Sequence, residues 1–424
     1  MQDKYFIPFT EQMKKEYTIL VPNMLPMHFK LIMSILATDG FKTELLETSG
    51  PEIAETGLKY THNDTCYPAI LVIGQFIEAL QSGKYDPHKV ALIMFQTGGG
   101  CRASNYISLI RKALIKAGFD YVPVISFSLH GIEDHPGFKL SLKLYHGMMY
   151  AILYADLLMS LNNQVRPYEI NKGDSAALCD KWIKKLGLEL GTQRISYRKI
   201  KKNYIEIVKS FAAIPLKKEP RVKVGVVGEI FVKYSPIANN DLENFLVSEG
   251  AEVVVPGLYD FCLFFVYNYM LEPKLYRKKI YLYPLFKVLY KFLCNKKEDL
   301  AKAIRANSSF DTATPFDHVA HMAEDIIHHA VKMGEGWLLT AEMVELAESG
   351  CGNIVCTQPF GCLPNHICGK GMMKPIKELK PDVNIVAIDY DAGASRVNQE
   401  NRLKLMLANA KKIMLEKEKN GETQ

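Results

Sequence analysis

The sequence lacks an apolar run long enough to cross a membrane. Its longest, Leu258–Leu271, has 14 residues and is closed by Glu272 and Pro273, whereas a membrane-spanning helix needs about 20. The N-terminus also lacks the basic segment and apolar stretch of a secretory signal. We therefore expect a soluble, cytoplasmic protein without a membrane span. In that reducing compartment its nine cysteines are more typical of metal ligands or free thiols than of disulfides.

The sequence has no strong excess of either charge. It contains 52 lysines and arginines against 46 acidic residues, a net charge of +6. Nucleic-acid-binding proteins concentrate positive charge more strongly, so we expect no nucleic-acid partner. A chain of 424 residues is too long for one core and indicates two or three domains.

Strand-like segments alternate with helix-like segments in two parts of the chain, a pattern typical of α/β proteins with parallel sheets. We expect two Rossmann-like parallel-sheet domains with helical insertions. Their bounds are 1–145 for the first domain, 146–219 for a helical linker, and 220–424 for the second domain with a helical insertion at 258–350. The predicted strands are Tyr17–Pro22, Lys42–Leu46, Val90–Phe95, Val122–Phe127, Arg221–Val227, Ala251–Val255, Asn353–Val355 and Asn384–Ile388.

Two local features carry further expectations. Asp64 and Thr65 are predicted to cap a helix from about Cys66 to Leu80, with Pro68 in its first turn. The aromatic and basic stretch 274–292 has two readings: an amphipathic helix with snorkelling lysines, or a docking face for an acidic partner.

Cysteines stand next to glycine-rich or proline-bearing turns at three places. QTGGGCRASNY places Gly98, Gly99 and Gly100 directly after a predicted buried strand, followed by Cys101 and a helix. In an open α/β sheet, ligands bind beyond the carboxyl ends of the strands, and glycines let the backbone approach a ligand closely. Helix N-termini also favour anions, which suits a thiolate-bound iron–sulfur cluster. A phosphate-binding turn is the alternative, although no Walker lysine follows the glycines.

The other two places are HNDTCYP, which contains Cys66 at a predicted helix start, and CGNIVCTQPFGCLPNHICGKG. In the latter, Gly361 and Pro364 flank Cys362 and indicate a rigid, exposed turn. Cys351, Cys356 and Cys368 are further candidates, but none of the four forms a CxxC pair, which argues against a zinc ribbon. Cys179, Cys262 and Cys294 lie within helical patterns and are expected to be small buried hydrophobic residues.

These motifs resemble the 2-hydroxyacyl-CoA dehydratase superfamily, which includes the benzoyl-CoA reductase subunits. The resemblance is strongest to the acyl-CoA dehydratase activase-related branch, and the double-cubane cluster proteins are a sister group. It extends over most of the chain, through THNDTCYPA, QTGGGCRASNY, GEIFVKYSPIANNDLENFL, GEGWLLTAEM, QPFGCLPNHI and IDYDAGASRVNQENRLKL.

The resemblance implies an oxygen-sensitive [4Fe-4S] cluster between the two α/β domains, bound by Cys66, Cys101 and Cys362, with one iron open to substrate. The extra cysteines Cys351, Cys356 and Cys368 keep a double-cubane cluster open. Gly98, Gly99, Gly100 and Gly361 would line the cofactor, and His62, Arg102 and His366 are candidate catalytic groups. Polar residues that could support the ligands or transfer protons are Asp64, Asn105, Gln358, Asn365, Glu229 and Glu335.

The resemblance also implies an electron donor, an ATP-hydrolysing iron–sulfur activator of the sugar kinase/Hsp70/actin fold, and a homo- or hetero-oligomer. The expected activity is an iron–sulfur lyase or oxidoreductase that dehydrates or reduces an acyl-CoA or another small molecule by radical chemistry. The alternatives are a non-catalytic electron-transfer or accessory protein, a double-cubane reductase of small molecules, and a binding module with a structural cluster.

Overall fold

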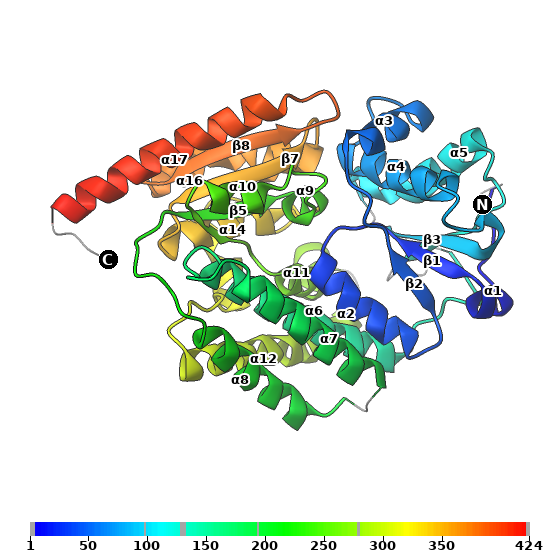
Figure 1. Ribbon diagram of the computed structural model, residues 1–424, viewed down its shortest axis with the longest axis horizontal. Helices are drawn as coiled ribbons and strands as arrows, with labels where there is room; N and C mark the ends of the chain where they lie inside the picture. The colour runs from blue at the N-terminus through cyan, green and yellow to red at the C-terminus, as the bar shows by residue number, and fades with distance from the viewer. Residues whose placement is uncertain (1–4, 97–98, 128–132, 193–194, 278–279, 421–424) are drawn as a thin grey trace.

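The computed structural model describes residues 5–96, 99–127, 133–192, 195–277 and 280–420. Within them the chain forms two four-stranded parallel sheets, side by side, with a layer of longer helices below both in the view of Figure 1. The predicted α/β class, with two Rossmann-like parallel-sheet domains and helical insertions, is therefore confirmed.

The first sheet is built from the first third of the chain, and its strands follow the order β2-β1-β3-β4. Its strands are β1 Thr18–Val21, β2 Lys42–Leu45, β3 Val90–Phe95 and β4 Val124–Phe127. Its helices are α1 Glu11–Glu16, α2 Pro26–Ala37, α3 Pro51–Tyr60, α4 Tyr67–Gln81 and α5 Tyr106–Ala117, with 3-10 turns η1 Pro87–Lys89 and η2 Arg102–Asn105.

The second sheet repeats this topology with the order β6-β5-β7-β8. Its strands are β5 Lys223–Gly228, β6 Glu252–Val254, β7 Asn353–Pro359 and β8 Asn384–Tyr390. Its helices are α9 Ile230–Tyr234, α10 Leu242–Ser248, α14 Trp337–Glu348, α15 Leu363–Cys368, α16 Met373–Leu379 and α17 Arg396–Lys419, with the 3-10 turn η4 Lys370–Met372.

In both sheets the strand order reverses once, between β1 and β3 and between β5 and β7. Such a reversal leaves a crevice beyond the carboxyl ends of the strands, where ligands of open α/β sheets bind. Each sheet therefore has one place best suited to hold a ligand. The segment that leaves β3 begins at that place in the first sheet, and the segments that leave β5 and β7 begin at that place in the second. Figure 1 places α9, which follows β5, on the side of the second sheet that faces α4.

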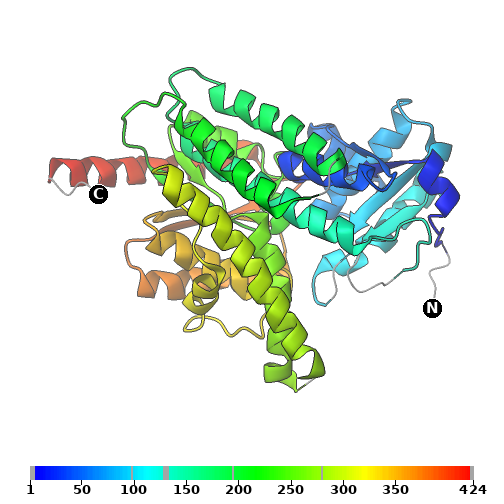
Figure 2. The same cartoon turned by 90° about the horizontal axis from the view of Figure 1, so that it is seen from below.

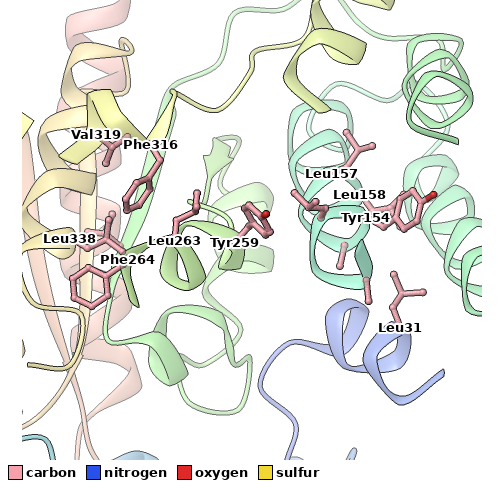
Figure 3. Packing of buried hydrophobic residues seen from close by; sticks show 14 of the residues in the cluster. Leu31, Tyr154, Leu157, Leu158, Tyr259, Leu263, Phe264, Phe316, Val319 and Leu338 are labelled. Carbon is pink, nitrogen blue, oxygen red and sulfur yellow. The ribbon is translucent and has the colours of Figure 1, made fainter. Parts of the chain in front are cut away.

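A layer of longer helices completes the molecule. Its members are α6 Leu142–Val165, α7 Asp174–Thr192, α8 Tyr197–Ala212, α11 Leu258–Tyr276, α12 Tyr283–Asn307 and α13 Phe316–Met322, with the 3-10 turn η3 Ile280–Leu282. Helix α2 of the first unit packs on α6 and α7, and α11 packs on α6 and α12. Side chains from α2, α6, α11, α13 and α14 meet in one buried cluster (Figure 3), so burial of apolar surface ties the layer to both units.

The apolar run at Leu258–Leu271 forms most of α11, a buried helix as expected. No helix in the described part of the chain has the length and apolar character needed to cross a membrane. The aromatic and basic stretch lies on the end of α11, on η3 and on the start of α12, which extend from the body in Figure 2. Leu285 and Val288 of α12 are exposed. Lys278 and Lys279, within the predicted docking face, lie outside the described residues.

Two details differ from the sequence predictions. Helix α4 begins at Tyr67 with Cys66 as its N-cap and without a side-chain cap, so the predicted capping by Asp64 and Thr65 is wrong. The His62–Thr65 segment instead closes its own turn, in which Thr65 N–H donates to the His62 carbonyl at 3.0 Å. Strand β7 continues four residues beyond its predicted end, because Thr357 and Gln358 are buried with hydrogen bonds to Val227 and Asp389.

Candidate functional site

The three predicted ligands occupy equivalent positions, each at the N-cap of a helical segment. Cys66 precedes α4, Cys101 precedes η2, and Cys362 precedes α15. Cys101 follows β3 and Cys362 follows β7, so the two lie beyond the carboxyl ends of strands that flank the reversal in each sheet. The structure thus assembles the predicted cysteines from both α/β units.

The charge of Cys101 affects the pKa of Cys66, and the charge of Cys66 affects the pKa of Cys362. Burial, followed by the charges of Glu229 and Cys101, raises the pKa of the Cys66 thiol to about 12. The pKa of Cys362 is also raised, first by burial and then by Glu229, with contributions from Glu335 and Cys66. Cys66 therefore interacts with both other cysteines, across the boundary between the two units.

Glycine and methionine bring the two units into close approach beside these thiols. A Cβ added to Gly100 would lie 2.4 Å from the sulfur of Met333, so only glycine fits there without displacing that side chain. Gly99 has a left-handed backbone, with φ of +82°, and Gly361 likewise has φ of +70°. Gly98 lies outside the described residues. Gly99, Gly100 and Gly361 thus shape the turns before Cys101 and Cys362.

Two acidic side chains lie beside the thiols. Glu229 is the N-cap of α9 and accepts a hydrogen bond from Val232 N–H at 2.8 Å. Glu335 is buried, and its Oε1 accepts from Ile230 N–H at 2.9 Å. Burial, and then the charge of Glu335, raises the pKa of Glu229 to about 8. Burial also raises the pKa of Glu335, so the pair favours holding a proton.

Side-chain hydrogen bonds reach two of the three sulfur atoms. The hydroxyl of Tyr106, the first residue of α5, lies 3.3 Å from Cys66 Sγ. Asn365 Nδ2 donates to Cys362 Sγ at 3.4 Å and to Glu335 Oε2 at 3.1 Å. Asn365 was predicted as a supporting residue. Tyr106 was not, although its place five residues after Cys101, at a helix start, could have indicated it.

The three additional cysteines lie at separate places. Cys351 precedes β7, with its Sγ 3.8 Å from the Asn353 carbonyl oxygen. Cys356 is inside β7, where it pairs with Val227 and Ala387, and Cys368 ends α15. All three are buried. Cys179, Cys262 and Cys294 lie in α7, α11 and α12, within helices as predicted.

The candidate catalytic groups lie on the surface around the thiols. His62 is 75% exposed and lies 3.4 Å from Asp64, which is also exposed. Arg102, in η2, and Asn105 are exposed. His366 is exposed, and its Nδ1 lies 2.9 Å from the Cys362 carbonyl oxygen, one turn back on its own helix. The hydrogen bonds and ion pairs of His62 and His366 described above are thus to residues nearby in the sequence.

Gln358, another predicted supporting residue, is fully buried near the end of β7. Its Nε2 donates to Asp389 Oδ1 at 2.6 Å, and Lys370 also donates to that carboxylate. Gln358 Oε1 has no hydrogen-bond partner among the described residues. The carboxyl end of β7 therefore carries a buried polar group directly before the turn that leads to Cys362.

The donor set consists of sulfur and oxygen groups that can bind a metal when they are deprotonated. Three thiols and two carboxyl groups gather where burial makes negative charge costly, and a metal that binds thiolates offsets that cost. No group of three or more His, Cys, Asp or Glu side chains among the described residues is arranged to hold a metal ion. In a cubane each cysteine binds a different iron, so its ligand sulfurs lie farther apart than those around one ion.

The two best-formed cavities in the described part of the chain lie elsewhere. They hold about 20 and 10 Å³, and residues of α6 to α8 line the larger one. About one water fits in such a volume.

Comparisons with protein families, with curated proteins and with solved structures find no match to this chain.

Proposed function

We propose that this protein is an iron–sulfur protein in which Cys66, Cys101 and Cys362 bind a [4Fe-4S] cluster. The observation that carries the proposal is that the three cysteines are helix N-caps from two α/β units, and that Cys101 and Cys362 follow strands at the strand reversals of the two sheets. The sequence resemblance to 2-hydroxyacyl-CoA dehydratases supports it independently. Cys351, Cys356 and Cys368 are buried before β7, within β7 and at the end of α15, and we propose one cubane rather than a double cubane.

When bound, such a cluster supplies a low-potential electron and an iron that can polarise a substrate oxygen. Residues of the chain itself would orient the cluster ligands and hold a proton beside them. Tyr106 and Asn365 orient the sulfurs of Cys66 and Cys362. Glu229 and Glu335 hold a buried proton next to the thiols, where the reduction of a substrate would consume one. On this basis we propose radical dehydration or reduction of an acyl-CoA or another small molecule.

The proposal includes a separate electron donor. The sequence contains no Walker A motif, and a low-potential site needs an energy input to be reduced. The resemblance implies an ATP-hydrolysing activator of the sugar kinase/Hsp70/actin fold. Its docking place remains a prediction, with Lys287 on the exposed start of α12 as the candidate within the described residues.

The first test is anaerobic purification with quantification of iron and sulfide, followed by electron paramagnetic resonance after reduction with dithionite. We expect about four irons and four sulfides per chain, and the electron paramagnetic resonance signal of a [4Fe-4S] cluster that has been reduced by one electron. About eight irons would favour the double cubane. A protein that takes up no iron from iron and sulfide under anaerobic conditions, while remaining folded by circular dichroism, would contradict the proposal.

A further inference from the structure

Two buried side chains bond to the cysteine sulfurs from outside the ligand set. Tyr106 is 6% exposed and Asn365 is fully buried. Tyr106 comes from α5, across from Cys66 at the start of α4, and Asn365 comes from the first turn of α15. Each contact therefore joins a ligand to a rigid element.

Chemistry fixes the direction of the Tyr106 contact when Cys66 is a metal ligand. Either atom can donate in the metal-free protein. A metal-bound cysteine is a thiolate and has no proton to donate. The Tyr106 hydroxyl must then donate to Cys66 Sγ. A tyrosine hydroxyl, with an ordinary pKa of about 10, keeps its proton at neutral pH and can donate it.

Glu335 fixes the orientation of the Asn365 amide. The amide nitrogen has two hydrogens, and it donates one to Glu335 Oε2 and the other to Cys362 Sγ. Turning the amide over would place Oδ1 against a carboxyl oxygen and a sulfur, which both accept. Ile230 N–H holds the other oxygen of Glu335, so the carboxyl is anchored from α9 as well.

This orientation has a cost within the described structure. Asn365 Oδ1 is buried without a hydrogen-bond partner, and an unsatisfied buried acceptor costs about 1–3 kcal/mol. An apolar residue of similar size would avoid the cost. The structure therefore retains an amide whose side-chain nitrogen donates to Glu335 and to the ligand Cys362.

We infer that Tyr106 and Asn365 are positioning residues that raise the reduction potential of the site by donating hydrogen bonds to Cys66 and Cys362, with Glu335 aligning Asn365. The inference rests on the proposed function. A donor to a ligand sulfur stabilises the more negative, reduced state more than the oxidised state, and burial strengthens the effect. The step is a one-electron reduction by an external donor, in which no bond forms or breaks.

The test compares Tyr106→Phe and Asn365→Leu with wild type in anaerobic, cluster-loaded protein. Iron content, the electron paramagnetic resonance signal and the midpoint potential from a mediated redox titration are measured for each. Tyr154→Phe is the matched control, because Tyr154 is also buried with a bonded hydroxyl but packs in α6. Tyr106→Phe removes one oxygen only, so it keeps the test open if Asn365→Leu fails to fold.

We expect both variants to retain iron. At the wild-type midpoint, the ratio of reduced to oxidised cluster should fall about tenfold in each, equivalent to about 59 mV for a one-electron couple. The control should match wild type. If the variants bind the cluster and its midpoint potential equals that of wild type, the inference is overturned while the proposed function stands. Loss of iron from folded Tyr106→Phe would also overturn it, because the residue would then serve assembly. A wild-type protein without iron would instead contradict the proposed function.

Discussion

At the scale of single residues, the site combines groups that the sequence revealed with groups that only the fold identifies. Cys66, Cys101 and Cys362 could be predicted because each adjoins a turn at a helix start. Glu335 is also among the predicted supporting residues, but its burial could not be predicted, because that burial depends on contacts with Ile230 and Asn365, which lie 105 and 30 residues away. Charge and turn chemistry predict a surface glutamate there as readily as a buried one.

The buried ion pair between Lys233 and Glu342 predicts how the free energy of unfolding depends on pH. Lys233 Nζ lies 3.2 Å from Glu342 Oε1, and both residues are buried. Burial raises the pKa of Glu342 to about 7 although Lys233 opposes the shift. The folded state therefore binds this proton more tightly than the unfolded state. The contribution of Glu342 to the free energy of unfolding is fully present below about pH 4.5 and is lost as the pH rises to about 7.

Glu342→Gln removes this ionisation. We expect the free energy of unfolding of wild type, minus that of the variant, to be larger at pH 5 than at pH 8, as measured by urea unfolding. Glu378→Gln, at an exposed position, is the control. A difference that stays constant or grows between pH 5 and pH 8 would contradict the assignment.

At the scale of elements, the turn from β5 into α9 positions Glu229. Gly228 ends β5 with φ of +139°, and an added Cβ would lie 1.8 Å from the Thr357 carbonyl oxygen in β7. That carbonyl also accepts a hydrogen bond from Glu229 N–H at 2.9 Å. The close approach of the two strands at this point therefore requires glycine.

We expect Gly228→Ala to lower the free energy of unfolding by at least about 3 kcal/mol, since the backbone of β7 must move. Gly40→Ala is the control. Gly40 also has a left-handed backbone, with φ of +85°, but open space around it, so only the conformational cost of about 1–2 kcal/mol applies. Equal losses in the two variants, measured by denaturant unfolding, would show that contact with Thr357 is unimportant.

Elements were predicted better than their ends. Strand β3 has its predicted bounds, Val90–Phe95, because a short apolar run bounded by polar residues is a clear signal. Strand β7 was predicted too short because its last residues are polar, and their burial depends on partners in β5 and β8. The start of α4 shows the same limit: Cys66 replaces the expected polar cap because the segment's hydrogen bonds close within His62–Thr65.

At the scale of the whole molecule, two sheets of the same topology lie side by side, and the layer of longer helices lies along one side of both (Figure 1). Alternating patterns in the sequence predict both sheets. They do not predict how the sheets are oriented, because that depends on packing among helices such as α6 and α11, whose buried residues are apolar on several faces. The meeting of Cys66 and Cys101 with Cys362 follows from that packing.

The most direct test of the central claim compares iron binding in two sets of single cysteine variants, reconstituted anaerobically and folded by circular dichroism. Cys66→Ala, Cys101→Ala and Cys362→Ala should each lose most of the iron and the reduced-cluster resonance, because a cubane held by three cysteines has no spare ligand. Cys356→Ala and Cys368→Ala should retain about four irons, since these thiols lie inside β7 and at the end of α15. Full iron in Cys362→Ala, or its loss in Cys356→Ala, would contradict the account.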